Sequence, residues 1–507
     1  MDTHATGITV EHEAGTPLLA PRHANGEVLR ASMAYMVAGL GGFLLMGLLG
    51  LLMRLDQGGL VVIPPTWFYR LMTLHGAGMV ASILLAGLGG LAAAVSATTR
   101  LSARALWIAL VVYLLGTGFV DLATLIGGFG AGWTVLYPLP EHGLVWTLDA
   151  ALAMYIGYLF VALGLLLFCV HMLYALATSH GGLTKVLALR YLFSGGRDGR
   201  DALPRPPELI AAVISIDGIV AAASGAVYLI PLFAQAAGVV ESVNALFAKN
   251  AVLLFGHTMA NLSIYVTAGL VYAALPAFTG RAWRTTWPVV FAWDLIIILM
   301  LINYSHHLYA DFAQPLGLQL LAEIASYAVA LPSFIVTVIG ALALIYRSGM
   351  RWTVAPILLA IGVWGWVFGG LGAVLDATIP VNQVMHNTMW VPAHFHTYYL
   401  LGAVAFAWGY LFYMVRELSD RGDTRASRMA AWLYGIGGAG FIFMFFVAGA
   451  NSVPRRYAVH LAQWQGYARI AVPFVVLLAL SLAWLSWDIG ARFGAAWRGT
   501  HGPTIEP

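Results

Sequence analysis

Twelve long apolar runs restrict the fold of this chain more than any other feature of the sequence. Each run is long enough for a helix that crosses about 30 Å of hydrocarbon, which takes about 20 residues. Of the 507 residues, 61% are hydrophobic and only 9% are charged, which is too few charges to cover a water-exposed surface of this size. A soluble enzyme is therefore excluded, and an all-α, polytopic membrane protein is predicted.

The runs predict helices near residues 32–53, 68–95, 105–127, 148–176, 208–236, 250–279, 286–312, 319–346, 352–376, 388–415, 427–450 and 469–490. We expect an N-terminal tail over residues 1–30, a single membrane domain over 31–491 and a C-terminal tail over 492–507. The residues before Ala31 show no short apolar core with a cleavage site, so no removable signal peptide is expected.

An even number of spans places both termini on the same side of the membrane. Connectors on that side hold 19 of the 25 Lys and Arg residues, so the positive-inside rule predicts that both termini are cytoplasmic. The net charge of +3 is therefore interpreted as membrane topology, with lipid and not nucleic acid as the surrounding partner.

Six histidines lie inside the predicted spans, where a polar side chain is costly enough to suggest function. The spans and their directions place all six at a similar depth in the outer half of the membrane. They are His75, His257, His306, His307, His394 and His396. Unrelated core histidines are not expected to share one depth, and the common layer favours a buried metal cluster.

Helical spacing suggests how these histidines are divided. His394 and His396 point about 200° apart on a helix, so they cannot chelate one ion but can serve two sites on opposite faces. His306 and His307 are adjacent and can converge on one metal together with His257.

One histidine of span ten is left to pair with His75. Such a pair can supply the two axial ligands of a six-coordinate haem. The other histidine of span ten would then bind a five-coordinate haem that has an open face.

Several segments between Trp67 and Arg469 resemble the catalytic subunit of haem-copper oxidases and nitric oxide reductases, most closely the ba3-type (B-type) branch. The matching segments are His75-Gly76, Gly132–Pro138, Phe255-Gly256-His257, Ser305-His306-His307 and His386–His396. The resemblance implies a twelve-helix core in a bacterial inner membrane. It also implies His75 and His396 on a low-spin haem, His394 on a high-spin haem, and His257, His306 and His307 on a non-haem metal, with both haems expected to be b-type.

A pair of arginines in the loop before the last span is an exception to the positive-inside rule, because this loop lies on the predicted outer side. Arg455 and Arg456 follow Pro454, and the planar guanidinium suits carboxylates such as haem propionates. In the family a similar Pro-Arg-Arg segment binds the propionates, and His386 resembles a residue beside them. We expect all three side chains at the propionates.

Asn261 marks the sharpest departure from the family. Oxygen reductases that resemble this branch carry a tyrosine at this position, one turn after the histidine of span six, where it supplies an electron and a proton. An amide forms hydrogen bonds but has no accessible redox chemistry. Reduction of two NO to N2O needs two electrons, which the metal centres can deliver without a tyrosine, so the sequence favours nitric oxide reduction. We hypothesise that the Asn261 amide donates a hydrogen bond to an N–O oxygen of hyponitrite.

Three imidazoles without a carboxylate favour copper over iron as the non-haem metal. The chain has one cysteine, Cys169, and no Cys-x-x-Cys-His segment, so a second subunit of CuA or haem c type is expected to deliver electrons. Two alternatives remain open: a terminal oxygen reductase that uses cytochrome c or quinol, and a transporter with a histidine proton relay and no haem.

Overall fold

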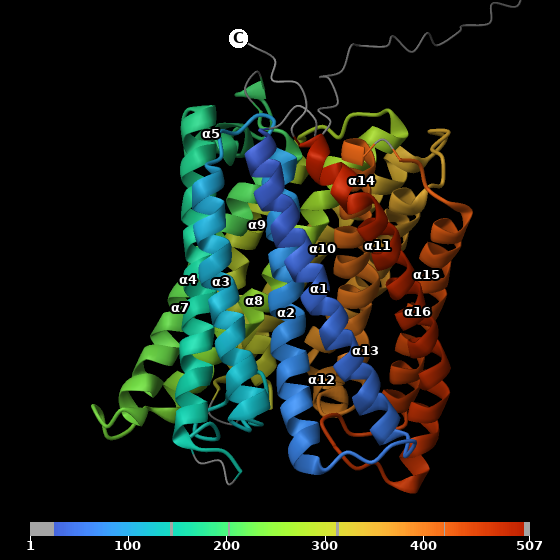
Figure 1. The fold of residues 1–507 in the computed structure, drawn as a ribbon. Helices are drawn as coiled ribbons and strands as arrows, with labels where there is room; N and C mark the ends of the chain where they lie inside the picture. Colours follow the sequence, from blue (N-terminus) through green and yellow to red (C-terminus); the bar gives the residue numbers. More distant parts are fainter. Residues whose placement is uncertain (1–24, 142–144, 201–202, 311–313, 420, 501–507) are drawn as a thin grey trace, which may run out of the picture.

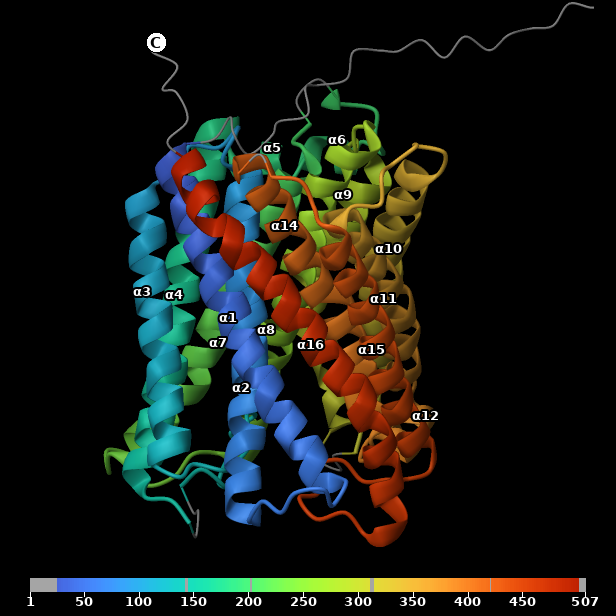
Figure 2. The ribbon, with the colours of Figure 1, turned by 45° about the vertical axis from the view of Figure 1, so that its right-hand side comes forward.

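The computed structural model describes residues 25–141, 145–200, 203–310, 314–419 and 421–500. Within these ranges the chain is helical apart from its connecting loops and one isolated bridge between Thr388 and Pro454. Among the described residues, twelve helical spans are long and apolar enough to cross a membrane, which confirms the predicted all-α membrane fold. Figures 1 and 2 show these spans side by side in a single bundle.

Long helices form most of the spans; the short helices α5, α6 and α12 lie in connectors, whereas η2, η4, α13 and η5 lie within spans. The elements in chain order are α1 (Gly26–Gln57), α2 (Pro65–Val95), α3 (Ala103–Asp121), η2 (Leu122–Ile126), α4 (Leu148–His180), α5 (Leu183–Val186), α6 (Leu189–Phe193), α7 (Pro206–Ala236), α8 (Ala245–Thr279), α9 (Trp287–Asn303), η4 (Tyr304–Leu308), α10 (Leu316–Ile345), α11 (Val354–Ala377), α12 (Ile379–Met385), α13 (Trp390–His396), η5 (Thr397–Val404), α14 (Ala405–Ser419), α15 (Arg425–Ala450) and α16 (Ala462–Gly499).

The first and last helices extend beyond the expected domain boundaries. α1 begins at Gly26 and α16 continues to Gly499, so the boundaries expected after residues 30 and 491 lie within helices. The start of α1 and the end of α16 are in contact: Arg30 Nε donates a hydrogen bond to Thr500 Oγ1 at 2.9 Å. The rest of the two expected tails, residues 1–24 and 501–507, lies outside the described residues.

Glycines allow neighbouring helices to pack closely. A Cβ at Gly39 of α1 would lie 2.4 Å from the backbone oxygen of Ser82 in α2, and one at Gly116 of α3 would lie 2.5 Å from the backbone nitrogen of Val161 in α4. Small residues at such crossings allow close backbone approach, which drives helix association in lipid. The first crossing holds α2, the helix that carries His75, against α1, and the second holds α3 against α4.

Helical geometry changes where the histidines cluster. α9 ends at Asn303 and continues as the 3₁₀ turn η4, while α13 passes into the π-helical segment η5 directly after His396. Such segments are uncommon within helices and are found often at functional sites. They change the direction of side chains within a span that otherwise remains continuous.

A buried ion-pair network joins α16 to the connector between α14 and α15. Arg492 lies 2.7 Å from Asp488 and 3.3 Å from Asp423, and the three side chains are between 4% and 10% exposed. Removing the arginine would leave two buried carboxylates without their cation.

We expect Arg492→Met to destabilise the protein by about 3–5 kcal/mol, the usual effect of breaking a buried ion pair on one side. Thermal unfolding in detergent measures the change. The matched control is Arg190→Met, whose pair with Asp198 is solvent-exposed and spans 3.9 Å. The control is expected to unfold like the unmodified protein, and equal unfolding of both variants would contradict the prediction.

Candidate metal centre

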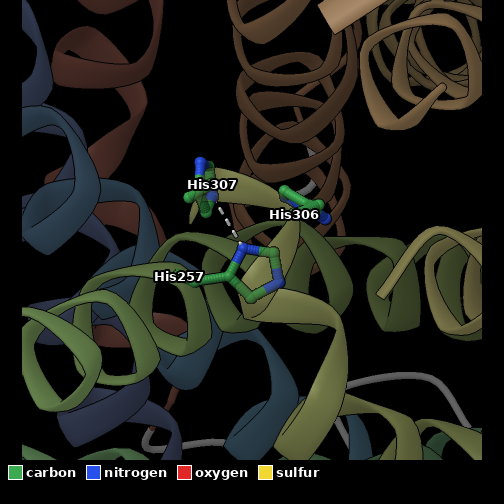
Figure 3. A group of neighbouring side chains, drawn as sticks. All are labelled: His257, His306 and His307. Atoms are coloured by element: carbon green, nitrogen blue, oxygen red, sulfur yellow. Dashed lines mark hydrogen bonds between the residues drawn. The ribbon is translucent and has the colours of Figure 1, made fainter. Parts of the chain in front are cut away.

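Three histidines from two segments of the chain converge in the bundle. His257 lies on α8, and His306 and His307 lie in η4 at the end of α9. Each ring offers one nitrogen such that all three nitrogens lie within 4.8 Å of one another, and His257 Nδ1 is 3.0 Å from His307 Nε2. Figure 3 shows the three rings close together, with the contact between His257 and His307 drawn as a dashed line. The three imidazoles form a group that could hold one metal ion.

Polar neighbours occupy the outer nitrogens of two of these rings. His306 Nδ1 lies 2.9 Å from Ser326 Oγ on α10. His257 Nε2 lies 3.1 Å from the Asn303 side-chain oxygen and 2.7 Å from the Asn261 amide nitrogen. Histidine ligands of metals usually have such an outer partner, which orients the ring. The sequence does not single out Asn303, although it is a polar residue one turn before His306 in an apolar span.

A second pair of histidines faces one another between α2 and α13. The His75 and His396 rings are 6.4 Å apart, centre to centre, and their planes differ by 17°. His75 Nδ1 lies 2.8 Å from the Met46 carbonyl oxygen, and His396 Nδ1 lies 2.7 Å from the Pro392 carbonyl oxygen. These contacts leave Nε2 of both rings for a metal ion between them, so the pair fits the axial ligands of a haem iron.

His394 lies on the other face of α13. Its ring packs against Tyr398 at 5.8 Å, and a Cβ at Gly372 of α11 would lie 2.7 Å from its Nδ1. His396 instead packs against Phe441 and Phe445 of α15. The two histidines therefore face different helices, as their spacing predicts, and they suit two separate cofactors.

The cationic residues expected at the propionates lie in two loops that are joined by backbone hydrogen bonds. Arg455 N donates to the Asn387 carbonyl at 2.9 Å, and Met389 N donates to the Val453 carbonyl at 2.9 Å. Burial, together with Arg455 and Arg456, lowers the pKa of His386 to about 4. Burial and Arg456 lower the pKa of Arg455 to about 10, and its buried Nε has no hydrogen-bond partner. A carboxylate from a ligand would offset this concentration of positive charge.

Two further cationic or titratable residues of this region are not singled out by the sequence analysis. Arg54, 6% exposed, lies over the Phe445 ring at 4.1 Å, and that ring contacts His396 at 5.2 Å. His460 is 4% exposed, and neither of its ring nitrogens has a hydrogen-bond partner. Burial and the nearby Arg54 lower the pKa of His460 to about 4. The sequence offers one signal for Arg54: it is an arginine on the side of the membrane whose connectors hold few basic residues.

Two tyrosines near the three-histidine cluster, Tyr304 and Tyr265, have their contacts elsewhere. The Tyr304 hydroxyl lies 3.3 Å from the Asn250 side-chain oxygen. Tyr265 packs between Trp293 and Trp366, at 5.9 and 6.2 Å. The amides of Asn261 and Asn303 contact Nε2 of His257, and Asn261 is the residue at the position that the sequence singles out.

An apolar cavity of about 80 Å³ lies beside α8. Leu74, Trp133, Tyr158 and Phe255 contribute to its lining, and Gly256 and Met259 bring it next to the turn of α8 that carries His257. An apolar cavity of this size is suitable for a small uncharged molecule.

Residues 30–477 match the family of cytochrome c and quinol oxidase polypeptide I. The chain belongs to this family. Oxidase polypeptide I proteins among its relatives include cytochrome c oxidase polypeptide 1 of Halobacterium salinarum, which is 29% identical over 257 residues, or 49% of this chain and 42% of that protein. Cytochrome c oxidase subunit 1 of Thermus thermophilus is 26% identical over 260 residues, or 47% of this chain and 45% of that protein. The alignments therefore span less than half the length of these two relatives.

Other relatives match more of the chain. A probable cytochrome c oxidase subunit 1-beta of Nocardia farcinica is 26% identical over 490 residues, which covers 90% of this chain and 77% of that protein. The cryo-EM structure of a heme-copper terminal oxidase dimer has the same fold, with a TM-score of 0.77 and 20% identity over 94% of this chain and 85% of that chain. These comparisons agree with the twelve-helix oxidase polypeptide I architecture.

Proposed function

We propose that this chain is the catalytic subunit of a nitric oxide reductase, which converts two NO, two electrons and two protons into N2O and water. The observation that carries the proposal is the Asn261 amide 2.7 Å from the outer edge of His257. In oxygen reductases of the resembling branch, this position holds a redox-active tyrosine. An amide cannot supply an electron, and NO reduction needs none from the protein.

The six histidines divide among three metal centres in this proposal. His75 and His396 hold a low-spin b-type haem, His394 holds a high-spin b-type haem, and His257, His306 and His307 hold a non-haem metal. Copper is favoured over iron, because the described ligand cluster consists of imidazoles alone. When bound, these groups supply one-electron transfer and a site for a diatomic ligand.

The protein itself contributes position, charge and exclusion of water. Arg455, Arg456 and His386 would bind the haem propionates, and this role is supported by the unpartnered Nε of Arg455. Contacts on one ring nitrogen hold four of the imidazoles, which fixes their ring orientation before substrate arrives. These four are the rings of His75, His257, His306 and His396. The apolar cavity beside α8 suits the storage of NO near His257.

The orientation and the partners follow from the charge pattern and the cysteine count. We place both termini in the cytoplasm of a bacterium, with the membrane domain in its inner membrane. A second subunit carrying CuA or haem c supplies electrons from the outer side, on which the histidine layer would lie. The domain limits of 1–30, 31–491 and 492–507 remain a prediction.

A terminal oxygen reductase is the second candidate, since the relatives described above are named cytochrome c oxidases. Its electron and proton would then come from a group other than a tyrosine at position 261. The two candidates share the cofactors and differ in the substrate that they consume.

Turnover of the purified complex with each gas tests the proposal. A reduced-minus-oxidised spectrum first shows whether haem is present, which a transporter would lack. We expect rapid N2O formation from NO without oxygen, and negligible O2 consumption with the same electron donor in air. Rapid O2 consumption with negligible N2O formation would instead support the oxygen reductase.

A further inference from the structure

His257 has a carboxamide on each side of its outer nitrogen. Nε2 lies 3.1 Å from Asn303 Oδ1 and 2.7 Å from Asn261 Nδ2, while Nδ1 faces His307 at 3.0 Å. Asn303 is 2% exposed and is the last residue of α9. A buried amide at this point is costly unless it forms hydrogen bonds.

The two amides favour different tautomers of His257. A neutral imidazole has one N–H donor and one acceptor nitrogen. The Asn303 oxygen only accepts, so it requires the proton on Nε2 and leaves Nδ1 free for a metal. The Asn261 amide nitrogen only donates, so it requires a proton-free Nε2 and places the proton on Nδ1.

We propose that Asn303 is a positioning residue that accepts the Nε2–H of His257 and thereby directs Nδ1 of this ring to the non-haem metal. The inference rests on the proposed metal-binding role of the three histidines. Asn261 favours the tautomer with the proton on Nδ1, in which this nitrogen cannot bind a metal. The amide of Asn261 therefore acts through His257.

Asn303 also joins the two segments that carry the ligands. It lies on α9 three residues before His306, and its side chain reaches His257 on α8. The single hydrogen bond therefore sets both the tautomer of one ligand and the distance of that ligand from the other two. Ser326 on α10 has the corresponding position at His306, at 2.9 Å.

Metal retention in the purified full-length complex tests this role. We expect Asn303→Leu, which keeps the size of the side chain and removes the acceptor, to weaken copper binding by about 10–100-fold. The measurement is copper per haem by elemental analysis after dialysis against graded chelator, with the low-spin haem spectrum as the check on folding. Asn303→Asp keeps an acceptor and is expected to restore retention.

Two matched variants separate this role from general damage. Asn451→Leu removes an exposed carboxamide at the end of α15 and is expected to retain copper like the unmodified protein. Asn261→Leu removes a donor that competes with the metal-bound tautomer, so it is expected to bind copper at least as tightly. A purely structural amide pair would weaken copper binding in both Asn303→Leu and Asn261→Leu.

Failure of the inference is distinct from failure of the proposed function. Unmodified protein that contains haem but binds no non-haem metal overturns the proposed function, and the inference with it. Unmodified protein that binds copper, together with Asn303→Leu that retains it equally, overturns the inference alone. Loss of copper from Asn303→Asp as complete as from Asn303→Leu also overturns it.

Discussion

Changing His306 to alanine is expected to lower NO reduction by more than about 100-fold and to remove the non-haem metal. The effect should exceed the loss that follows removal of an outer hydrogen-bond partner, because a ligand itself is lost. The His306 ring lies 4.8 Å from the His257 ring and 4.4 Å from the His307 ring, so it completes the group of three. N2O formation and metal content measure the two effects.

The low-spin haem spectrum of the His306→Ala variant is expected to stay unchanged, because His75 and His396 lie on α2 and α13 and not on η4. A matched control is His171→Ala. His171 accepts a hydrogen bond from the Ser102 backbone N–H at the start of α3, at 3.0 Å, and takes no part in the proposed centre. Full NO turnover by His306→Ala would contradict the three-histidine site.

Changing His75 to alanine is expected to give the reciprocal pattern. The low-spin haem band should disappear and turnover with the electron donor should fall to background, because one of the two histidines that would hold this haem is lost. The non-haem metal should remain, since its three ligands are on other elements. Optical spectra, metal content and N2O formation together measure this outcome.

Glycines of α1 provide a milder version of the same test. A Cβ at Gly50 would lie 2.8 Å from His75 Cε1, so Gly50→Ala must displace the ring, whereas a Cβ at Gly47 meets nothing within 4 Å. We expect Gly50→Ala to shift the low-spin haem band and Gly47→Ala to leave it in place. An unchanged band in both His75→Ala and Gly50→Ala would contradict the assignment of the low-spin site.

Much of the fold could be predicted because lipid imposes a simple rule on sequence. A helix must satisfy its own backbone hydrogen bonds in hydrocarbon, so every long apolar run becomes a helix and the runs can be counted. Helix ends are less predictable. α16 continues to Gly499 and carries Arg492, whose ion pairs with Asp488 and Asp423 are not apparent from hydropathy.

The candidate site could be predicted in part, because the regular rise and turn of a helix relate the sequence position of a residue to its depth in the membrane and to the direction of its side chain. His394 and His396 face different neighbours in the structure, as expected for helical residues i and i+2, which point about 200° apart. Arg54, His460 and Asn303 could not be found in this way. Their importance depends on which helices pack together, and residues such as Arg54 and Phe445 are far apart in sequence.

The sequence alone determined the helical spans, since these depend on local hydropathy and on the fixed rise of a helix, and it predicted the six histidines and their common layer. Only the tertiary structure decided which rings face one another and which nitrogen of each ring is held by a neighbour. It also placed two amides at the edge of His257. These features depend on contacts between helices, where side-chain packing sets distances that no single segment contains.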